Sequence, residues 1–113
     1  MDDLIEILKQ RKNNILKDPK KLDRLKSLNL IVKLKITDEN KGLLLILKRG
    51  TIEILQVDAE EDIVPNIIIS AKKEVVLDIL NKNQNVFSAY FAGKFKVEGE
   101  KDLLLEYYNL LFE

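Results

Sequence analysis

Apolar side chains recur at helical spacing in the first 28 residues of the chain. Within residues 3–17 they form one stripe, which a basic pair interrupts in the middle: Leu4, Ile5, Leu8, Ile15 and Leu16. Asp18 and Pro19 then mark the start of a second, shorter helix, because Asp is a common N-cap and Pro is tolerated in the first helical turn. The pattern therefore predicts two helices within residues 1–28.

After residue 29 the spacing changes to the alternation that is typical of strands. Every second residue from Leu30 to Ile36 is aliphatic, which predicts a half-buried strand with lysines on its other face. The run Leu43–Leu47 is apolar on both faces and is expected to lie centrally in the sheet. Because the connections at 38–42 and 48–50 are short, the first three strands are expected to form an antiparallel meander. The remaining strands in this region are predicted over two segments, Thr51–Val57 and Asn66–Ser70.

Helical spacing returns after the fourth strand. Ser70 is expected to cap a helix over residues 71–81, and Asn85 is expected to cap a shorter one that runs to Ala92. Gly93 stands where a left-handed residue commonly ends a helix. The chain then alternates over residues 94–98, which predicts a fifth strand, and becomes amphipathic over residues 101–112, which predicts a last helix.

This order of elements predicts one α+β domain over residues 1–113. Its sheet is expected to be mixed and five-stranded, built from the meander and the later strands and packed with helices. The domain divides into N-terminal helices at 1–28, strands at 29–70, helices at 71–92, a strand at 94–98 and a C-terminal helix at 101–112.

Composition removes several kinds of chemistry. The 113 residues include no Cys and no His, which excludes disulfides, thiolate nucleophiles, Cys/His zinc sites and histidine acid–base catalysis. The carboxylates Glu60, Glu61 and Asp62 have no nucleophile motif beside them, so we interpret them as a solvated loop. We therefore expect no enzyme, no metal and no cofactor.

Charge distribution bears on partners and location. The 19 basic and 19 acidic side chains balance, and the strands other than 94–98 carry no aromatic residue, so we expect no nucleic-acid partner. Residues 9–26 hold eight basic and two acidic side chains, which indicate either transient contact with an anionic membrane surface or a solvated face. Since there is no signal-peptide pattern and no long apolar run, we expect a cytoplasmic protein.

Aromatic side chains gather near the end of the chain. All seven lie in residues 87–112, and the segment 101–112 is apolar around most of its circumference. A helix of that kind is buried, binds a membrane or lines something apolar. Three interpretations stay open at this point: an ordinary core, an apolar pocket, and a homodimer interface.

One segment carries a family resemblance. Residues 88–99 read SAYFAGKFKVEG, which resembles the sterol carrier protein type 2 family, also called the sterol-binding or lipid-transfer domain. The likeness continues in Asn109 and Leu110, and in the step from Ile69 and Ser70 into an apolar helix, and it covers roughly residues 30–112. The chain departs from the family pattern where a frequent Gly is Lys82 and where a Pro is Val86.

The resemblance implies a fold whose sheet and helices enclose an apolar tunnel, and a non-catalytic function as a binder or carrier of sterol-, fatty-acyl- or isoprenoid-like lipids. A long apolar ligand needs a cavity with few polar groups, and it needs no acid, base or metal. We predict that the lining comprises Val76, Leu80, Phe87, Phe91, Phe95, Leu104, Tyr108 and Leu111. The alternative is an interaction module with a filled core that uses its last helix against a partner or a second copy.

Overall fold

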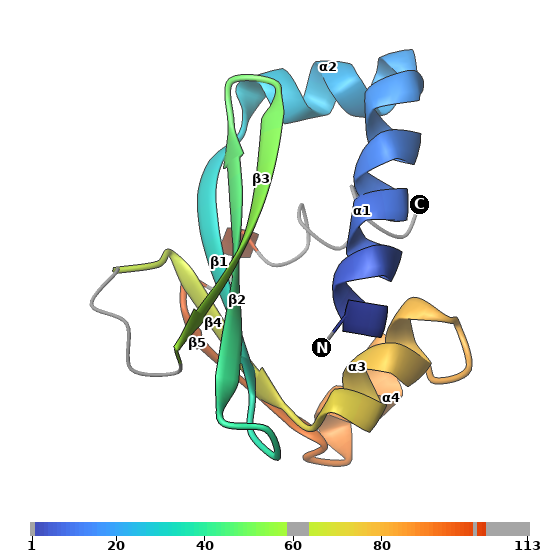
Figure 1. The fold of residues 1–113 in the computed structure, drawn as a ribbon, viewed down its shortest axis with the longest axis vertical. Helices are drawn as coiled ribbons and strands as arrows, with labels where there is room; N and C mark the ends of the chain where they lie inside the picture. Colours follow the sequence, from blue (N-terminus) through green and yellow to red (C-terminus); the bar gives the residue numbers. More distant parts are fainter. Residues whose placement is uncertain (1, 59–63, 101, 104–113) are drawn as a thin grey trace.

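A five-stranded sheet with helices on one face makes up the part of the chain that the structure describes (Figure 1). The computed structural model describes residues 2–58, 64–100 and 102–103. The elements follow in the order α1 (Asp2–Lys17), α2 (Pro19–Ser27), β1 (Asn29–Ile36), β2 (Lys41–Lys48), β3 (Thr51–Asp58), β4 (Ile67–Ala71), α3 (Lys73–Leu80), α4 (Val86–Phe91) and β5 (Phe95–Gly99). The predicted acidic loop at 59–62 and, apart from Asp102 and Leu103, the predicted helix at 101–112 lie outside the described residues.

The strands lie in the order β3-β2-β1-β4-β5, which confirms the predicted mixed sheet. The hairpins β1–β2 and β2–β3 are antiparallel, β1 and β4 are parallel, and β4 and β5 are antiparallel. β2, which contains Leu43–Leu47, is interior as expected, but the middle position belongs to β1. The reason is that the chain crosses from the β3 edge to the other side of β1 before it forms β4.

The face of the sheet that the helices cover is apolar. The alternate residues Leu30, Val32, Leu34 and Ile36 of β1 are all buried there, as the pattern predicted. The helices cover them with buried residues from four elements: Leu4, Leu8 and Ile15 of α1, Leu25 of α2, Val76 and Leu80 of α3, and Ala89 of α4. Burial of these aliphatic side chains is the main stabilising contribution to the two-layer arrangement.

The opposite face of the sheet differs from the expectation at one residue. Lys33 was expected to point to solvent, yet only 4% of it is exposed. Its neighbours across the two ladders are Leu44 of β2 and Ile68 of β4. Ile31 and Lys35, on the same face of β1, are only half-buried, so the position of Lys33 on the middle strand does not by itself account for its burial.

Helix ends follow the predicted caps at two places and not at a third. The Asp18 carboxylate accepts hydrogen bonds from the backbone of α2, and the Asn85 side chain accepts from Phe87 and Ser88 at the start of α4. Ser70 does not cap a helix, because β4 continues through it and α3 begins only at Lys73. The backbone N–H of Lys73, at the start of α3, instead donates to Asp38 Oδ1 in the β1–β2 turn, at 3.0 Å.

Candidate functional site

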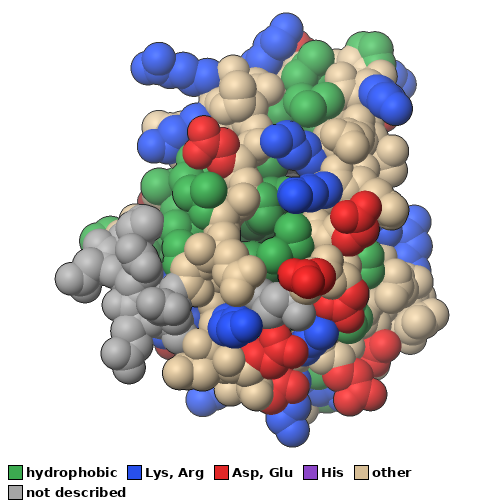
Figure 2. Space-filling view, in the orientation of Figure 1, with side chains coloured by type: hydrophobic (Ala, Val, Ile, Leu, Met, Phe, Trp, Pro, Cys, Tyr) green, Lys and Arg blue, Asp and Glu red, His purple; other side chains and the backbone are tan. Residues whose placement is uncertain are grey.

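The region between the sheet and the helices is an apolar core. On the β4–β5 half of the sheet, Ile67, Ala71, Phe95 and Val97 are buried on the helix-covered face. Figure 2 shows apolar side chains reaching the surface in the strip between β3 and α1, with charged side chains around them. No described side chain places a buried nitrogen or oxygen in this region without a hydrogen-bond partner. The buried side chains of this region are therefore apolar or hydrogen-bonded.

Charged groups link the first turn of α3 to two other parts of the fold. The Nζ of Lys73 lies 2.9 Å from Asp3 Oδ1 at the start of α1 and 3.5 Å from Glu39 Oε1 in the β1–β2 turn. The hydrogen bond from Lys73 holds the pKa of Asp3 below its usual range, and the same bond raises the pKa of Lys73. Both groups therefore stay charged at neutral pH, and together with Glu39 they link α1, α3 and the β1–β2 turn.

Aromatic side chains meet where α4 leads into β5. The ring of Tyr90 lies 5.6 Å from the ring of Phe95, and 5.8 Å from the ring of Phe91 in an edge-to-face arrangement. Phe95 is buried, whereas 41% of Tyr90 and 83% of Phe91 are exposed. The cluster thus runs from the core at Phe95 to the surface at Phe91, whose ring is largely exposed to solvent.

The predicted lining residues fall into three groups. Val76 and Leu80 of α3 and Phe95 of β5 are buried in one core cluster. Phe87, which is 54% exposed, and Phe91 lie on the outer side of α4. Leu104, Tyr108 and Leu111 lie outside the described residues. The assignment of all eight to a ligand-binding lining stays a prediction.

Tyr90, which is not among the predicted lining residues, packs against two of them. It links Phe91 to Phe95 and so connects the exposed rings to the core. The spacing of the sequence could have indicated this residue, because Phe87 and Tyr90 are three positions apart and residues at that spacing share a helix face.

The described part of the chain lacks the features that two other kinds of site require. Within residues 2–58, 64–100 and 102–103, no three His, Cys, Asp or Glu side chains are grouped so as to hold a metal ion. In the same ranges no helix combines the length and the apolar character that crossing a bilayer requires.

Solved structures share this fold. The UbiJ-SCP2 ubiquinone synthesis protein is 14% identical with a TM-score of 0.74, and the match covers 96% of this chain and 91% of that chain. The sterol carrier protein domain 2 of Helicoverpa armigera is 18% identical with a TM-score of 0.73, over 94% of this chain and 83% of that chain. The sec-alkylsulfatase Pisa1 from Pseudomonas sp. is 17% identical with a TM-score of 0.67, over 81% of this chain. This chain spans only 14% of the length of that sulfatase.

The sequence itself identifies the family. Curated proteins gave no significant match to the chain. The family model described as the SCP-2 sterol transfer family matches residues 8–112, which is nearly the whole chain. The likeness to sterol carrier protein structures confirms the expected α+β fold with a five-stranded mixed sheet. On this evidence the chain belongs to the SCP-2 sterol transfer family.

Proposed function

We propose that this chain is a non-catalytic carrier that binds one apolar lipid between its sheet and its helices. The family match over residues 8–112 carries the proposal. The apolar residues between the two layers support it, since about 0.8 kcal/mol is gained for each ligand methylene that leaves water. The proposed ligand is a sterol-, fatty-acyl- or isoprenoid-like molecule, and the proposed place of work is the cytoplasm.

In this proposal the lining residues have two roles. Val76, Leu80 and Phe95, which are buried, contact the bound hydrocarbon together with Leu104, Tyr108 and Leu111. Phe87 and Phe91, which are exposed, contact the ligand as it enters or leaves. The tyrosine hydroxyl of Tyr108 offers a polar contact for the head group of an otherwise apolar ligand.

The test is displacement of a fluorescent fatty acid, with native mass spectrometry of the purified protein to detect a co-purified lipid. We expect saturable binding in the micromolar range or tighter. The variant Leu104→Asp should abolish it, because an ionised carboxylate in an apolar site is strongly disfavoured. The matched control is Leu55→Asp, which places the same charge at a partly exposed position on the other face of the sheet and should bind normally.

The interaction-module alternative is decided by the same experiment. Absence of both a co-purified lipid and probe binding would overturn the carrier proposal. An interaction module would then be expected to form homodimers or partner complexes through the segment 101–112, and sedimentation would detect the dimer. Probe binding that is equal in Leu104→Asp and in wild type would contradict the proposed lining.

Membrane contact through residues 9–26 is a further part of the proposal, since a carrier exchanges its ligand with a membrane. The lysines of this segment supply electrostatic attraction to anionic lipids. Its apolar side chains are less available, because Ile15 and Leu25 are buried against the sheet. In this proposal the segment attracts the membrane surface through its basic side chains and does not insert Ile15 or Leu25 into it.

A further inference from the structure

We propose that two copies of this chain pair along the β3 edge of the sheet and form a dimer with one continuous sheet. The two outer strands are β3 and β5, so each leaves one side of its backbone without a neighbouring strand. β3 is eight residues long and pairs with β2 along its whole length, without a bulge. An edge of this kind is a template for another strand. The proposal goes beyond the carrier function and does not depend on it.

β3 lacks the features with which proteins usually protect an edge strand. Lysine, proline, a bulge or a short length discourages pairing with a second chain. The strand Thr51–Asp58 contains no Lys, Arg or Pro. β5, at the other edge, is five residues long and carries the charged residues Lys96 and Glu98. Of the two edges, β3 is therefore the one suited to pairing.

The turn before β3 determines which of its backbone groups point away from the sheet. The two residues of this turn, Arg49 and Gly50, both have positive φ, as in a type I′ hairpin, and the residues that flank such a turn form a hydrogen-bonded pair. Counting from that pair, Ile52, Ile54 and Gln56 direct their N–H and C=O groups outward. No described residue forms a backbone hydrogen bond with these outward groups. They are therefore available to a second strand.

A two-fold axis at Leu55 gives β3 a self-complementary register. It places Leu55, which is 44% exposed, opposite the same residue of the second copy. Glu53 then lies opposite Val57, so the two Glu53 carboxylates are kept apart. Ile54, half-buried on the helix-covered face, falls opposite Gln56, so the outward backbone groups of the two strands match. Such reciprocal pairing of one surface with itself is what a two-fold dimer requires.

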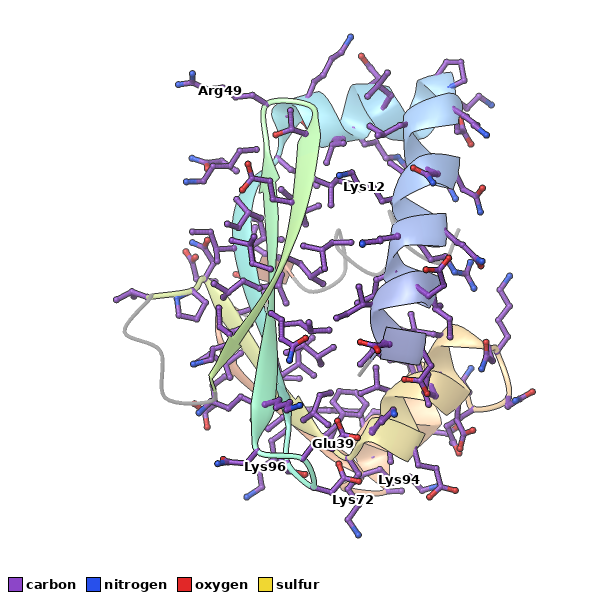
Figure 3. The ribbon with its side chains drawn as sticks, in the orientation of Figure 1. Lys12, Glu39, Arg49, Lys72, Lys94 and Lys96 are labelled. Carbon is purple, nitrogen blue, oxygen red and sulfur yellow. The ribbon has the colours of Figure 1, made fainter. Side chains whose placement is uncertain are left out.

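α1 lies beside this edge and supplies charge complementarity. It packs against β3, and both elements run along the long axis of the molecule (Figure 1). Its first half carries the exposed acids Asp2 and Glu6, and its second half carries Lys9 and Lys12. Figure 3 shows Lys12 on the side of α1 that faces β3. No ion pair joins these four side chains to a described residue. A two-fold axis makes the second α1 antiparallel, so its acidic half lies beside the basic half of the first.

The face that contains β3 and α1 is large enough for a stable dimer. Figure 2 shows this face, with apolar side chains exposed in the strip between the two elements. It spans the two longer extents of the molecule, 35 and 32 Å. A standard interface buries about 800 Å² on each partner, which fits within this face. Contact between two copies here removes the apolar strip from water, which stabilises the dimer.

Sedimentation velocity over a range of protein concentrations tests the proposal. We expect wild type to show a monomer–dimer equilibrium in the micromolar range. Leu55→Asp should weaken dimerisation about tenfold or more, because it places two carboxylates opposite each other. Val64→Asp puts the same charge at an exposed apolar residue outside β3 and should dimerise as wild type does. Circular dichroism confirms that both variants fold.

Charge reversal in α1 tests the antiparallel arrangement. The double variants Asp2→Lys/Glu6→Lys and Lys9→Glu/Lys12→Glu place like charges of the two copies together, so each should dimerise about tenfold more weakly than wild type. Mixed in equal amounts, the two variants should form heterodimers, which native mass spectrometry recognises by mass. An effect within one chain cannot produce this rescue.

Three results would overturn the proposal: wild type that stays monomeric, Leu55→Asp that dimerises as wild type does, and a mixture without heterodimers. A dimer formed through segment 101–112 would give the second and third of these. The fate of the carrier function is read separately, because monomeric Leu55→Asp should still displace the fluorescent fatty acid. Loss of probe binding in wild type that still dimerises would overturn the carrier function and leave the dimer standing.

Discussion

Arg11 in the middle of α1 donates a hydrogen bond from Nη2 to the carbonyl oxygen of Leu80, the last residue of α3, at 2.6 Å. The two residues are 69 positions apart in sequence. The last carbonyls of a helix have no partner within the helix, and they carry the negative end of its dipole. A guanidinium at this position therefore stabilises α3 and fixes its distance from α1. This contact explains why the apolar stripe of α1 is interrupted at a basic residue.

Arg11→Ala should lower the free energy of unfolding by about 1–2 kcal/mol, because a hydrogen bond from a charged donor is lost and a carbonyl is left without it. Urea denaturation followed by circular dichroism measures the change. Lys9→Ala, on the exposed side of the same helix, serves as the control and should stay within about 0.5 kcal/mol of wild type. Equal midpoints for the two variants would contradict the structural role of Arg11.

Asp38→Ala should cost about 1 kcal/mol, the usual effect of removing a side chain that caps a helix. The carboxylate of Asp38 is the acceptor for the first turn of α3. Ser70→Ala should change stability much less, since Ser70 lies in β4 and not at the helix start. Thermal denaturation of both variants compares the observed cap with the one that the sequence pattern favoured, and a larger loss for Ser70→Ala would contradict the structure.

Gly99→Ala should strongly lower the free energy of unfolding, because it adds a methyl group at a position without room for one. Gly99 has a φ of +99°, and a Cβ there would lie far inside van der Waals contact with the backbone oxygen of Asn66. We expect a loss of about 2–4 kcal/mol from backbone strain and steric overlap together. Gly93→Ala is the control, because Gly93 also has a positive φ but open space around it, and it should lose about 1 kcal/mol. Similar losses for both would show that the contact with Asn66 adds nothing.

Lys82→Gly should stabilise the protein by about 0.5–1 kcal/mol. Lys82 occupies the position where the resembling family often has Gly, and it adopts a φ of +61°. The left-handed conformation is costly for a residue with a Cβ, and the gain on substitution is reduced by the greater freedom of Gly in the unfolded chain. Asn81→Gly, where φ is −85°, should be destabilising. Chemical denaturation of both variants tests the difference, and a loss of stability in Lys82→Gly would refute it.

The pair of Asp3 and Lys73 should make stability depend on pH. The folded pKa of Asp3 lies below its ordinary value of 3.8, so its contribution is present at neutral pH and is lost as pH falls through that lowered value. On the alkaline side the raised pKa of Lys73 keeps the contribution up to and beyond its ordinary value of 10.5.

Asp3→Asn should therefore be less stable than wild type at neutral pH, and the two should converge in strongly acidic solution. Asp2→Asn removes a charge one residue away and should show a smaller difference at neutral pH. Thermal melts across the pH range make the comparison, and a gap between Asp3→Asn and wild type that stays constant into acid would contradict the assignment.

The candidate site could be anticipated only in outline. The aromatic residues of α4 and β5 were visible as a group, and Val76, Leu80 and Phe95 are buried as apolar residues on a repeating stripe should be. The exposure of Phe87 and Phe91 could not be read from the pattern. Helical spacing says which residues share a face, but it does not say whether another element covers that face.

The sequence by itself determined the local structure and the family. The alternation in β1, the caps at Asp18 and Asn85 and the left-handed Gly93 are short-range effects, in which a residue and its near neighbours decide the conformation. Only the tertiary structure decided the contacts between distant segments. Asp38 caps α3, Arg11 donates to the last carbonyl of that helix, and Lys33 is buried on the middle strand. Each of these features depends on which elements become neighbours after the chain crosses the sheet. That crossing is driven by the hydrophobic effect, which acts on the whole apolar face of the sheet and has no preferred direction. A short stretch of sequence therefore does not determine which elements become neighbours.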